Sequence, residues 1–213
     1  EVLQNSGYKT AYIGKWHLAS KEAGPVPVKE RGGYDYWLGA NALERVSDAY
    51  DCTVYDKSNR KVKLPGYRVD ALTDAAIQYI DGAVREKDPF YLFISYLEPH
   101  HQNHRDDYPA PTGYEARYRG GWVPPDLAAL GGSSSRHLAG YYGMVKRLDE
   151  ALGRLLDALR SLALLDNTIV LFTSDHGDLL GDHGFWFKSL VCYEESIRVP
   201  LIGGVLLAVC AKR

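Results

Sequence analysis

The chain has 213 residues, of which 46% are hydrophobic and 24% are charged, and these values are typical of a globular protein with a substantial core. Lysine and arginine number 25 against 27 acidic residues, so the net charge is −2 and the basic excess of a nucleic-acid-binding surface is missing. No apolar run is long enough to span a membrane. Residues 1–10 carry no signal peptide, and neither the compartment nor the oligomeric state can be inferred.

Both ends of the sequence have the character of an interrupted domain. Residues 1–6 are typical of the last turns of a helix that Gly7 closes. Residues 199–210 form an apolar, glycine-broken run with no predicted element after it. We therefore expect the chain to be a fragment of a larger domain.

The first half of the chain predicts two strands around one helix. A short β-type run at 10–13 leads into "GKWHL", and residues 19–66 are irregular, with a hairpin expected around "DCTVYDKSNRKVKL". Apolar residues at helical spacing then predict an amphipathic helix over 68–85. The continuous apolar run at 90–97 is typical of a strand that is covered on both faces.

The second half predicts one long helix and a third strand. Residues 99–135 are irregular, and a leucine-rich face then runs from Leu138 to Leu159 with charged residues opposite it. A turn at 166–167 precedes the apolar run "TIVLFTS" at 168–174. Alternating strands and helices predict an α/β fold with a mostly parallel central sheet and helices on both faces.

Polar, titratable residues follow each of the three predicted strands. Ligands of parallel α/β sheets bind at the carboxyl ends of the strands, where the loops converge. We therefore expect the three groups to form one cationic, histidine-rich site for an anionic substrate at one edge of the sheet. The groups are Lys15 and His17; Glu98, His100, His101 and His104; and Asp175, His176, Asp182, His183 and Lys188.

Each group taken alone has a simpler explanation. Lys15 and His17 fit an exposed loop, and "GKWHL" lacks the glycine spacing and the Ser or Thr of a phosphate-binding loop. Asp175 and His176 offer a carboxylate and an imidazole, which suit a divalent cation; the less favoured alternative is that Asp175 caps the following turn. The sequence contains neither a GxSxG nor an HExxH motif. The prediction of a binding site therefore depends on the three groups lying together at one edge of the sheet.

Three motifs together resemble the sulfatases of the alkaline phosphatase superfamily. They are "GYKTAYIGKWHL" (7–18), "FISYLEPHH" (93–101) and "TSDHGDLLGDHGFWFKSLVCYEESIRVPLI" (173–202), in the order that the family has them. The resemblance implies an alkaline-phosphatase-like α/β fold that is incomplete here. It assigns residues 1–202 to part of a sulfatase-type catalytic domain and leaves the tail at 203–213 unassigned.

The resemblance also implies roles for individual residues. Asp175 and His176 match a pair that binds a divalent cation, usually calcium, with magnesium or manganese as alternatives. Lys15 and His17 match the residues that contact the sulfate and the nucleophile, and Lys188 matches a second lysine beside the sulfate. Such groups would neutralise charge on the non-bridging oxygens of a sulfate ester.

Three further histidines would face the rest of the substrate. His100 matches the residue that protonates the leaving alkoxide. His101 and His183 are expected to contact the substrate, while Asp182 is expected to be structural. The implied substrate is a small-molecule or carbohydrate sulfate ester.

The chain departs from the family at its nucleophile. The family uses a formylglycine made from the first residue of a C/S-x-P-x-R motif, and none of Cys52, Cys192 and Cys210 lies in one. We expect the formylglycine and two more metal-ligating aspartates in a missing N-terminal segment, and no activity from this chain alone. Two alternatives stay open: a phosphodiesterase or phosphonate monoester hydrolase of the same superfamily, and a non-catalytic anion-binding pseudoenzyme.

Overall fold

The computed structural model describes residues 1–130, 134–188 and 190–204. The chain forms two compact units. The first holds residues 1–98, 102–105 and 147–155, and the second holds residues 99–101, 106–146 and the chain from 156 onward. Within the described residues, no helix combines the length and the apolar character that crossing a membrane requires.

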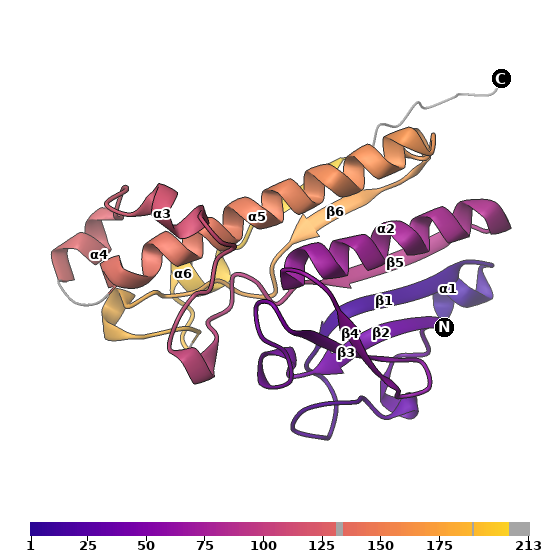
Figure 1. Ribbon diagram of the computed structural model, residues 1–213, viewed down its shortest axis with the longest axis horizontal. Coiled ribbons are helices and arrows are strands. Elements are labelled where there is room, and N and C mark those ends of the chain that lie inside the picture. Colours follow the sequence, from indigo (N-terminus) through magenta and orange to yellow (C-terminus); the bar gives the residue numbers. More distant parts are fainter. Residues whose placement is uncertain (131–133, 189, 205–213) are drawn as a thin grey trace. The chain divides into compact units, whose positions relative to one another are not determined.

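The first unit is a five-stranded sheet with one long helix (Figure 1). The strand order is β4-β3-β2-β1-β5. The elements are α1 (Val2–Asn5), β1 (Lys9–Trp16), η1 (Val28–Glu30), β2 (Tyr36–Asn41), η2 (Leu43–Arg45), β3 (Cys52–Asp56), β4 (Lys61–Leu64), α2 (Arg68–Glu86), β5 (Phe90–Ser95) and η3 (Asn103–Arg105).

This sheet is mixed. β1 runs parallel to both β2 and β5, whereas β2 pairs antiparallel with β3, and β3 with β4. The predicted α/β class and the hairpin within residues 51–64 are confirmed, and α2 covers the predicted helical range. β2 was not predicted, because it lies inside the stretch that the sequence marks as irregular. The parallel neighbours β1 and β5 end at the same edge of the sheet. Lys15 lies near the end of β1, and Glu98 follows shortly after the end of β5.

The two faces of the sheet are covered by different parts of the chain. α2 contacts β1 and β5, and its Tyr79 packs against Tyr36 and Phe90 on that face. The opposite face carries an aromatic stack in which Tyr12 lies 5.0 Å from Trp37 and 5.5 Å from Phe93, measured between ring centroids. Residues of the loop after β1, Val26 and Tyr34 among them, pack on this stack. The stack therefore fixes β1, whose last residues include Lys15.

A buried ion pair holds the chain beyond β5. Arg68 Nε donates to Glu98 Oε1 at 2.9 Å, and both side chains are fully buried. Arg68 Nη1 also donates to Gln102 Oε1 at 3.3 Å, and Gln102 Nε2 donates to the Glu44 carbonyl at 2.8 Å. The start of α2, the end of β5 and η2 are thereby tied together.

The second unit contains short elements and both ends of a long helix. They are α3 (Tyr114–Tyr118), α4 (Pro125–Leu130), η4 (Leu165–Asn167), β6 (Val170–Thr173), η5 (Asp182–Gly184), α6 (Glu194–Ile197) and β7 (Leu201–Gly204). The long helix, α5 (Ser134–Ser161), has residues in both units and confirms the predicted leucine-rich helix. The predicted tail at 203–213 lies outside the described residues beyond Gly204.

The third predicted strand does not join the five-stranded sheet. β6 instead pairs antiparallel with β7, with Val170 opposite Gly204 and Thr173 opposite Leu201. The prediction that three strands share one sheet is therefore wrong, because an apolar run specifies a strand but not the partner that takes its hydrogen bonds. β5 and β6 are also less buried than predicted, with Phe93 45% and Leu171 69% exposed. β5 is an edge strand, and β6 has a single neighbouring strand.

Candidate functional site

A cavity of about 750 Å³ in the second unit brings three of the predicted site residues together. Asp175 and His176 come from the turn after β6, and Lys188 comes from the end of the following loop. Sequence reasoning did not identify the remaining lining residues, which are Leu190, Val191, Ser196 and Ile197. The cavity combines a carboxylate, an imidazole and an exposed ammonium group with an apolar wall.

Asp175 and His176 have the geometry of a cation-binding pair. His176 Nδ1 lies 2.7 Å from the Gly177 carbonyl, which can only accept, so Nδ1 carries the proton and Nε2 keeps its lone pair. Metal-ligating histidines are commonly held in this way. Nε2 lies 3.6 Å from Asp175 Oδ2, a gap that a cation can bridge, and the Asp175 side chain is 82% exposed. The pair fits a divalent cation but supplies two donors, whereas calcium takes six to eight oxygens.

Gly177 locks this turn against α6. Its N–H donates to the Ser196 carbonyl at 2.8 Å, and a Cβ at this position would lie 1.8 Å from the Glu195 carbonyl oxygen. Only glycine allows the two backbones to approach so closely. On the other side of the turn, Ser174 Oγ donates to the His176 carbonyl at 2.6 Å, so this hydroxyl has a structural partner.

A closed loop connects the cation pair to Lys188. Leu179 N–H donates to the Phe187 carbonyl and Gly181 N–H donates to the Phe185 carbonyl, both at 2.9 Å. Leu179 is fully buried beneath the loop. The closure returns the chain beside its starting point, and this is why Lys188 can line the same cavity as Asp175 and His176.

His183, at the tip of this loop, lies between two carboxylates. Its Nε2 is 3.8 Å from Asp182 Oδ2 and 3.5 Å from Glu195 Oε2, and its ring stacks on Tyr193 with 3.9 Å between centroids. Burial raises the pKa of Asp182. The ligand atoms of the three residues lie within 4.8 Å of one another, so this cluster could also hold a metal ion. Glu195 was not predicted as a site residue, and Asp182, although it lies in the predicted group, was expected to be structural.

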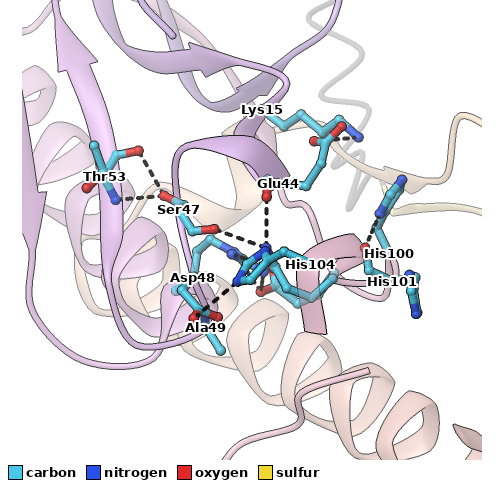
Figure 2. Close-up of polar contacts among 12 residues, drawn as sticks. Lys15, Glu44, Ser47, Asp48, Ala49, Thr53, His100, His101 and His104 are labelled. Carbon is cyan, nitrogen blue, oxygen red and sulfur yellow. Dashed lines mark hydrogen bonds and ion pairs between the residues drawn. The ribbon is translucent and has the colours of Figure 1, made fainter. Parts of the chain in front are cut away.

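His100 and His101 are oriented by local bonds. His100 Nδ1 donates to the His101 carbonyl at 2.6 Å (Figure 2), so its Nε2 is the nitrogen that can exchange a proton with a substrate. His101 is buried, and its Nε2 lies 3.2 Å from Asp106 Oδ1. Sequence reasoning offered no role for Asp106, which resembles an ordinary surface residue of a loop.

Lys15, His17, Glu98 and His104 belong to the first unit, whereas the other predicted site residues belong to the second. Lys15 Nζ lies 3.4 Å from Glu44 Oε2, and the two side chains are only 11% and 6% exposed (Figure 2). His17 follows β1 in an exposed position. Glu44 stands in η2, where the sequence predicted no element, so this partner of Lys15 was missed.

Comparison with known proteins identifies the family. The sulfatase family model matches residues 1–203. The chain belongs to the sulfatase family. It is 35% identical over 207 residues to an ulvan-active sulfatase of Formosa agariphila, and the match covers 95% of this chain and 39% of that protein. An N-acetylglucosamine-6-O-sulfatase of Bacteroides thetaiotaomicron is 27% identical, with 95% of this chain and 48% of that sulfatase covered.

Solved structures agree with this sulfatase fold. A Bacteroides fragilis protein assigned to the sulfatases superposes with a TM-score of 0.81 at 27% identity, over 96% of this chain and 48% of that one. A protein solved with its substrate D-glucosamine-2-N,6-O-disulfate has the same fold, with a TM-score of 0.69 at 24% identity, over 96% of this chain and 54% of that one. The chain thus spans 39 to 54% of the length of these relatives. The family implies a divalent metal, and the matches do not favour the phosphodiesterase, phosphonate hydrolase or pseudoenzyme alternatives.

Proposed function

We propose that this chain supplies part of the active site of a sulfatase that hydrolyses sulfate esters of carbohydrates. The observation that carries the proposal is the cavity that Asp175, His176 and Lys188 share, because it sets a cation-binding pair beside a lysine. The names of two relatives support a carbohydrate substrate: one is an ulvan-active sulfatase, and another is an N-acetylglucosamine-6-O-sulfatase.

The charged groups would bind the sulfate. Asp175 and His176 would hold the divalent cation, which we propose to be calcium and which would neutralise charge on the sulfate oxygens. Lys188 adds a positive charge at the wall of the same cavity. We propose that Lys15, near the end of β1, and His17, just after it, also neutralise charge on the sulfate oxygens. Such fixed charges stabilise a transition state in which negative charge grows on oxygen.

The histidines would act on the sugar side of the ester. When the S–O bond breaks, the leaving oxygen must take up a proton. His100 is proposed to donate that proton from Nε2, since Nδ1 is committed to the His101 carbonyl and fixes the ring. His101 and His183 are proposed to contact the substrate.

The nucleophile is proposed to be a formylglycine outside these 213 residues. The sequence contains no C/S-x-P-x-R motif, and the relatives are roughly twice as long as the chain. The 213-residue chain should therefore bind ligands without turning them over. Robust hydrolysis of an aryl sulfate by this chain with calcium added would show that the nucleophile assignment is wrong.

Calorimetric titration of the chain with calcium tests the cation site. We expect weak binding, with a Kd on the order of 10⁻⁴ to 10⁻³ M, because the pair is an incomplete ligand set. Asp175→Asn should abolish the binding heat. Glu195→Gln is the matched control, because Glu195 belongs to the other metal-capable cluster. Loss of binding in Glu195→Gln with retention in Asp175→Asn would instead place the cation between Asp182, His183 and Glu195.

A further inference from the structure

Glu44 is a buried carboxylate to which the chemistry proposed above gives no role. Its side chain is 6% exposed, and its Oε2 atom lies 3.4 Å from Nζ of Lys15, whose side chain is 11% exposed (Figure 2). A carboxylate loses hydration when it leaves water, and such groups are almost never fully buried unless they are paired. The pairing with Lys15 is therefore the feature that explains why a carboxylate stands here.

Stability alone is a weak explanation for this ion pair. The attraction between two buried charges is offset by the cost of taking both out of water, and packed hydrophobic residues are often at least as stable. A buried pair does hold its two members together, because either charge left alone in the interior is strongly unfavourable. The pair is better explained by the place in which it keeps the ammonium group of Lys15.

The backbone of Lys15 is fixed by its neighbours. The Tyr12 hydroxyl donates to the Lys15 carbonyl, and Lys15 lies opposite Ala40 in the parallel ladder between β1 and β2. The preceding residue, Gly14, has φ +112°, and a Cβ there would lie 2.0 Å from the Ser95 carbonyl oxygen of β5. The strand thus sets the position of the Lys15 Cα, and its flexible four-carbon side chain is the part that still has to be oriented.

The backbone of Glu44 is fixed by contacts within the same unit. Glu44 stands in η2, and the start of η2 is tied to β1 because the Ala42 N–H donates to the Trp16 carbonyl at 2.9 Å. The fully buried Gln102 donates from Nε2 to the Glu44 carbonyl at 2.8 Å. Arg68 Nη1 donates to Gln102 Oε1 at 3.3 Å and so orients this amide. The carboxylate therefore projects toward Lys15 from a rigid base.

A second ion pair of η2 lacks these properties. Arg45, the residue after Glu44, pairs with Glu22, and their side chains are 52% and 82% exposed. Exposed ion pairs contribute little and are screened by salt. The same short helix therefore carries one buried pair and one exposed pair, and the exposed pair provides a matched control.

We propose that Glu44 is a positioning residue that aims the ammonium group of Lys15 at the sulfate. The inference rests on the proposed function for the role of Lys15. An ammonium group carries three N–H donors, so an ion pair with one carboxylate oxygen leaves donors for the sulfate oxygens. A lysine that is already oriented also loses less conformational entropy when it binds an anion. The negative charge of Glu44 by itself repels sulfate, so positioning and repulsion predict opposite effects when that charge is removed.

The first measurement observes the Lys15 ammonium group by ¹H–¹⁵N NMR of the 213-residue chain, with Lys15→Arg to identify its signal. Ammonium protons held in a buried ion pair exchange slowly with water and are visible, whereas those of a mobile lysine exchange too fast. Glu44→Gln keeps the size of the side chain and removes its charge, so it should abolish the signal. Glu22→Gln is the control and should leave the signal unchanged, because it removes the exposed pair with Arg45.

The second measurement is calorimetric titration with inorganic sulfate. Glu44→Gln should weaken sulfate binding at least about tenfold, the scale of the rotamer entropy of one lysine, and Glu22→Gln should not. Glu44→Asp should recover part of the loss, because it keeps the charge but carries it one methylene further from Lys15. Unchanged or tighter sulfate binding by Glu44→Gln, or a Lys15 signal that survives in it, would overturn the inference.

Failure of the proposed function would give a different result. If the Lys15 signal depends on Glu44 but the unaltered chain binds no sulfate, the sulfate-binding role of Lys15 is wrong and its orientation by Glu44 is upheld. Urea titration shows whether each variant is folded. If Glu44→Gln is unfolded, Glu44→Asp takes its place in both measurements, and a signal and a sulfate affinity equal to those of the unaltered chain would overturn the inference.

Discussion

Replacing Gly177 by alanine tests whether α6 holds the cation pair in place. The added methyl carbon would lie 1.8 Å from the Glu195 carbonyl oxygen, whereas ordinary contact begins at 3.4 Å. The two segments must therefore separate by about 1.6 Å (3.4 − 1.8), which would break the 2.8 Å bond from Gly177 N–H to the Ser196 carbonyl. Overpacking costs about 1–3 kcal/mol, and the lost hydrogen bond costs about 1 kcal/mol more.

We expect Gly177→Ala to lower the free energy of unfolding by roughly 2–4 kcal/mol in urea titrations. The calcium affinity should fall as well, because His176 Nδ1 is bonded to the Gly177 carbonyl and moves with it. Gly153→Ala is the matched control. No atom of the described residues lies within 4 Å of a Cβ at Gly153, which stands inside α5. This change should therefore stabilise the chain by about 0.5–1 kcal/mol and leave calcium binding unchanged.

The reasoning is refuted if Gly177→Ala unfolds within about 0.5 kcal/mol of the unaltered chain, the range of neutral surface changes. Such a result would mean that the turn and α6 separate without cost. If stability falls but calcium affinity does not, the turn is structural, and the cation lies elsewhere than at Asp175 and His176.

Two further predictions concern the first unit. Glu98→Gln should destabilise the chain by about 3–5 kcal/mol in urea titrations, because it leaves the fully buried Arg68 without its counter-charge. The double change Arg68→Met, Glu98→Leu should recover most of that loss of stability. A double variant as unstable as the single one would contradict this account. The pKa of Asp35 is lowered, chiefly by the N–H of Thr10, which donates to it at 2.9 Å. Its contribution to stability is therefore present above the unfolded pKa of 3.8 and is lost as the pH falls through the lower folded value. Asp35→Asn should flatten the dependence of Tm on pH in this acidic range, and an unchanged slope would show that the bond adds nothing.

Local patterns predicted the elements that depend on local forces. The helical spacing of apolar residues located α2 and α5, and the β3–β4 hairpin lies where a hairpin was expected, around "DCTVYDKSNRKVKL". β2 was missed, because "YWLGAN" lacks alternation and acquires its hydrogen bonds from β1, far away in the sequence. The pairing of β6 with β7 could not be predicted for the same reason: both are apolar runs, and nothing in an apolar run selects its partner.

In the candidate site, too, features of the local sequence were predictable, whereas contacts made by the tertiary fold were not. Titratable residues after predicted strands were visible in the sequence, and Asp175, His176 and Lys188 do share a cavity. Glu44 and Glu195 were missed, because each meets its partner only through the tertiary fold.

His100 and His176 show why residue type alone could not assign the roles of the histidines in the proposed site. His100 and His176 use the same device: Nδ1 donates to the carbonyl of the next residue, which fixes the ring and its tautomer. For His176, Asp175 Oδ2 stands 3.6 Å from Nε2, and a carboxylate beside an unprotonated nitrogen makes a cation site. For His100, the same bond leaves Nε2 as the nitrogen that can exchange a proton with a substrate. Residue type and local conformation are therefore alike at the two positions, and the different roles proposed for them depend on tertiary surroundings that the sequence does not display.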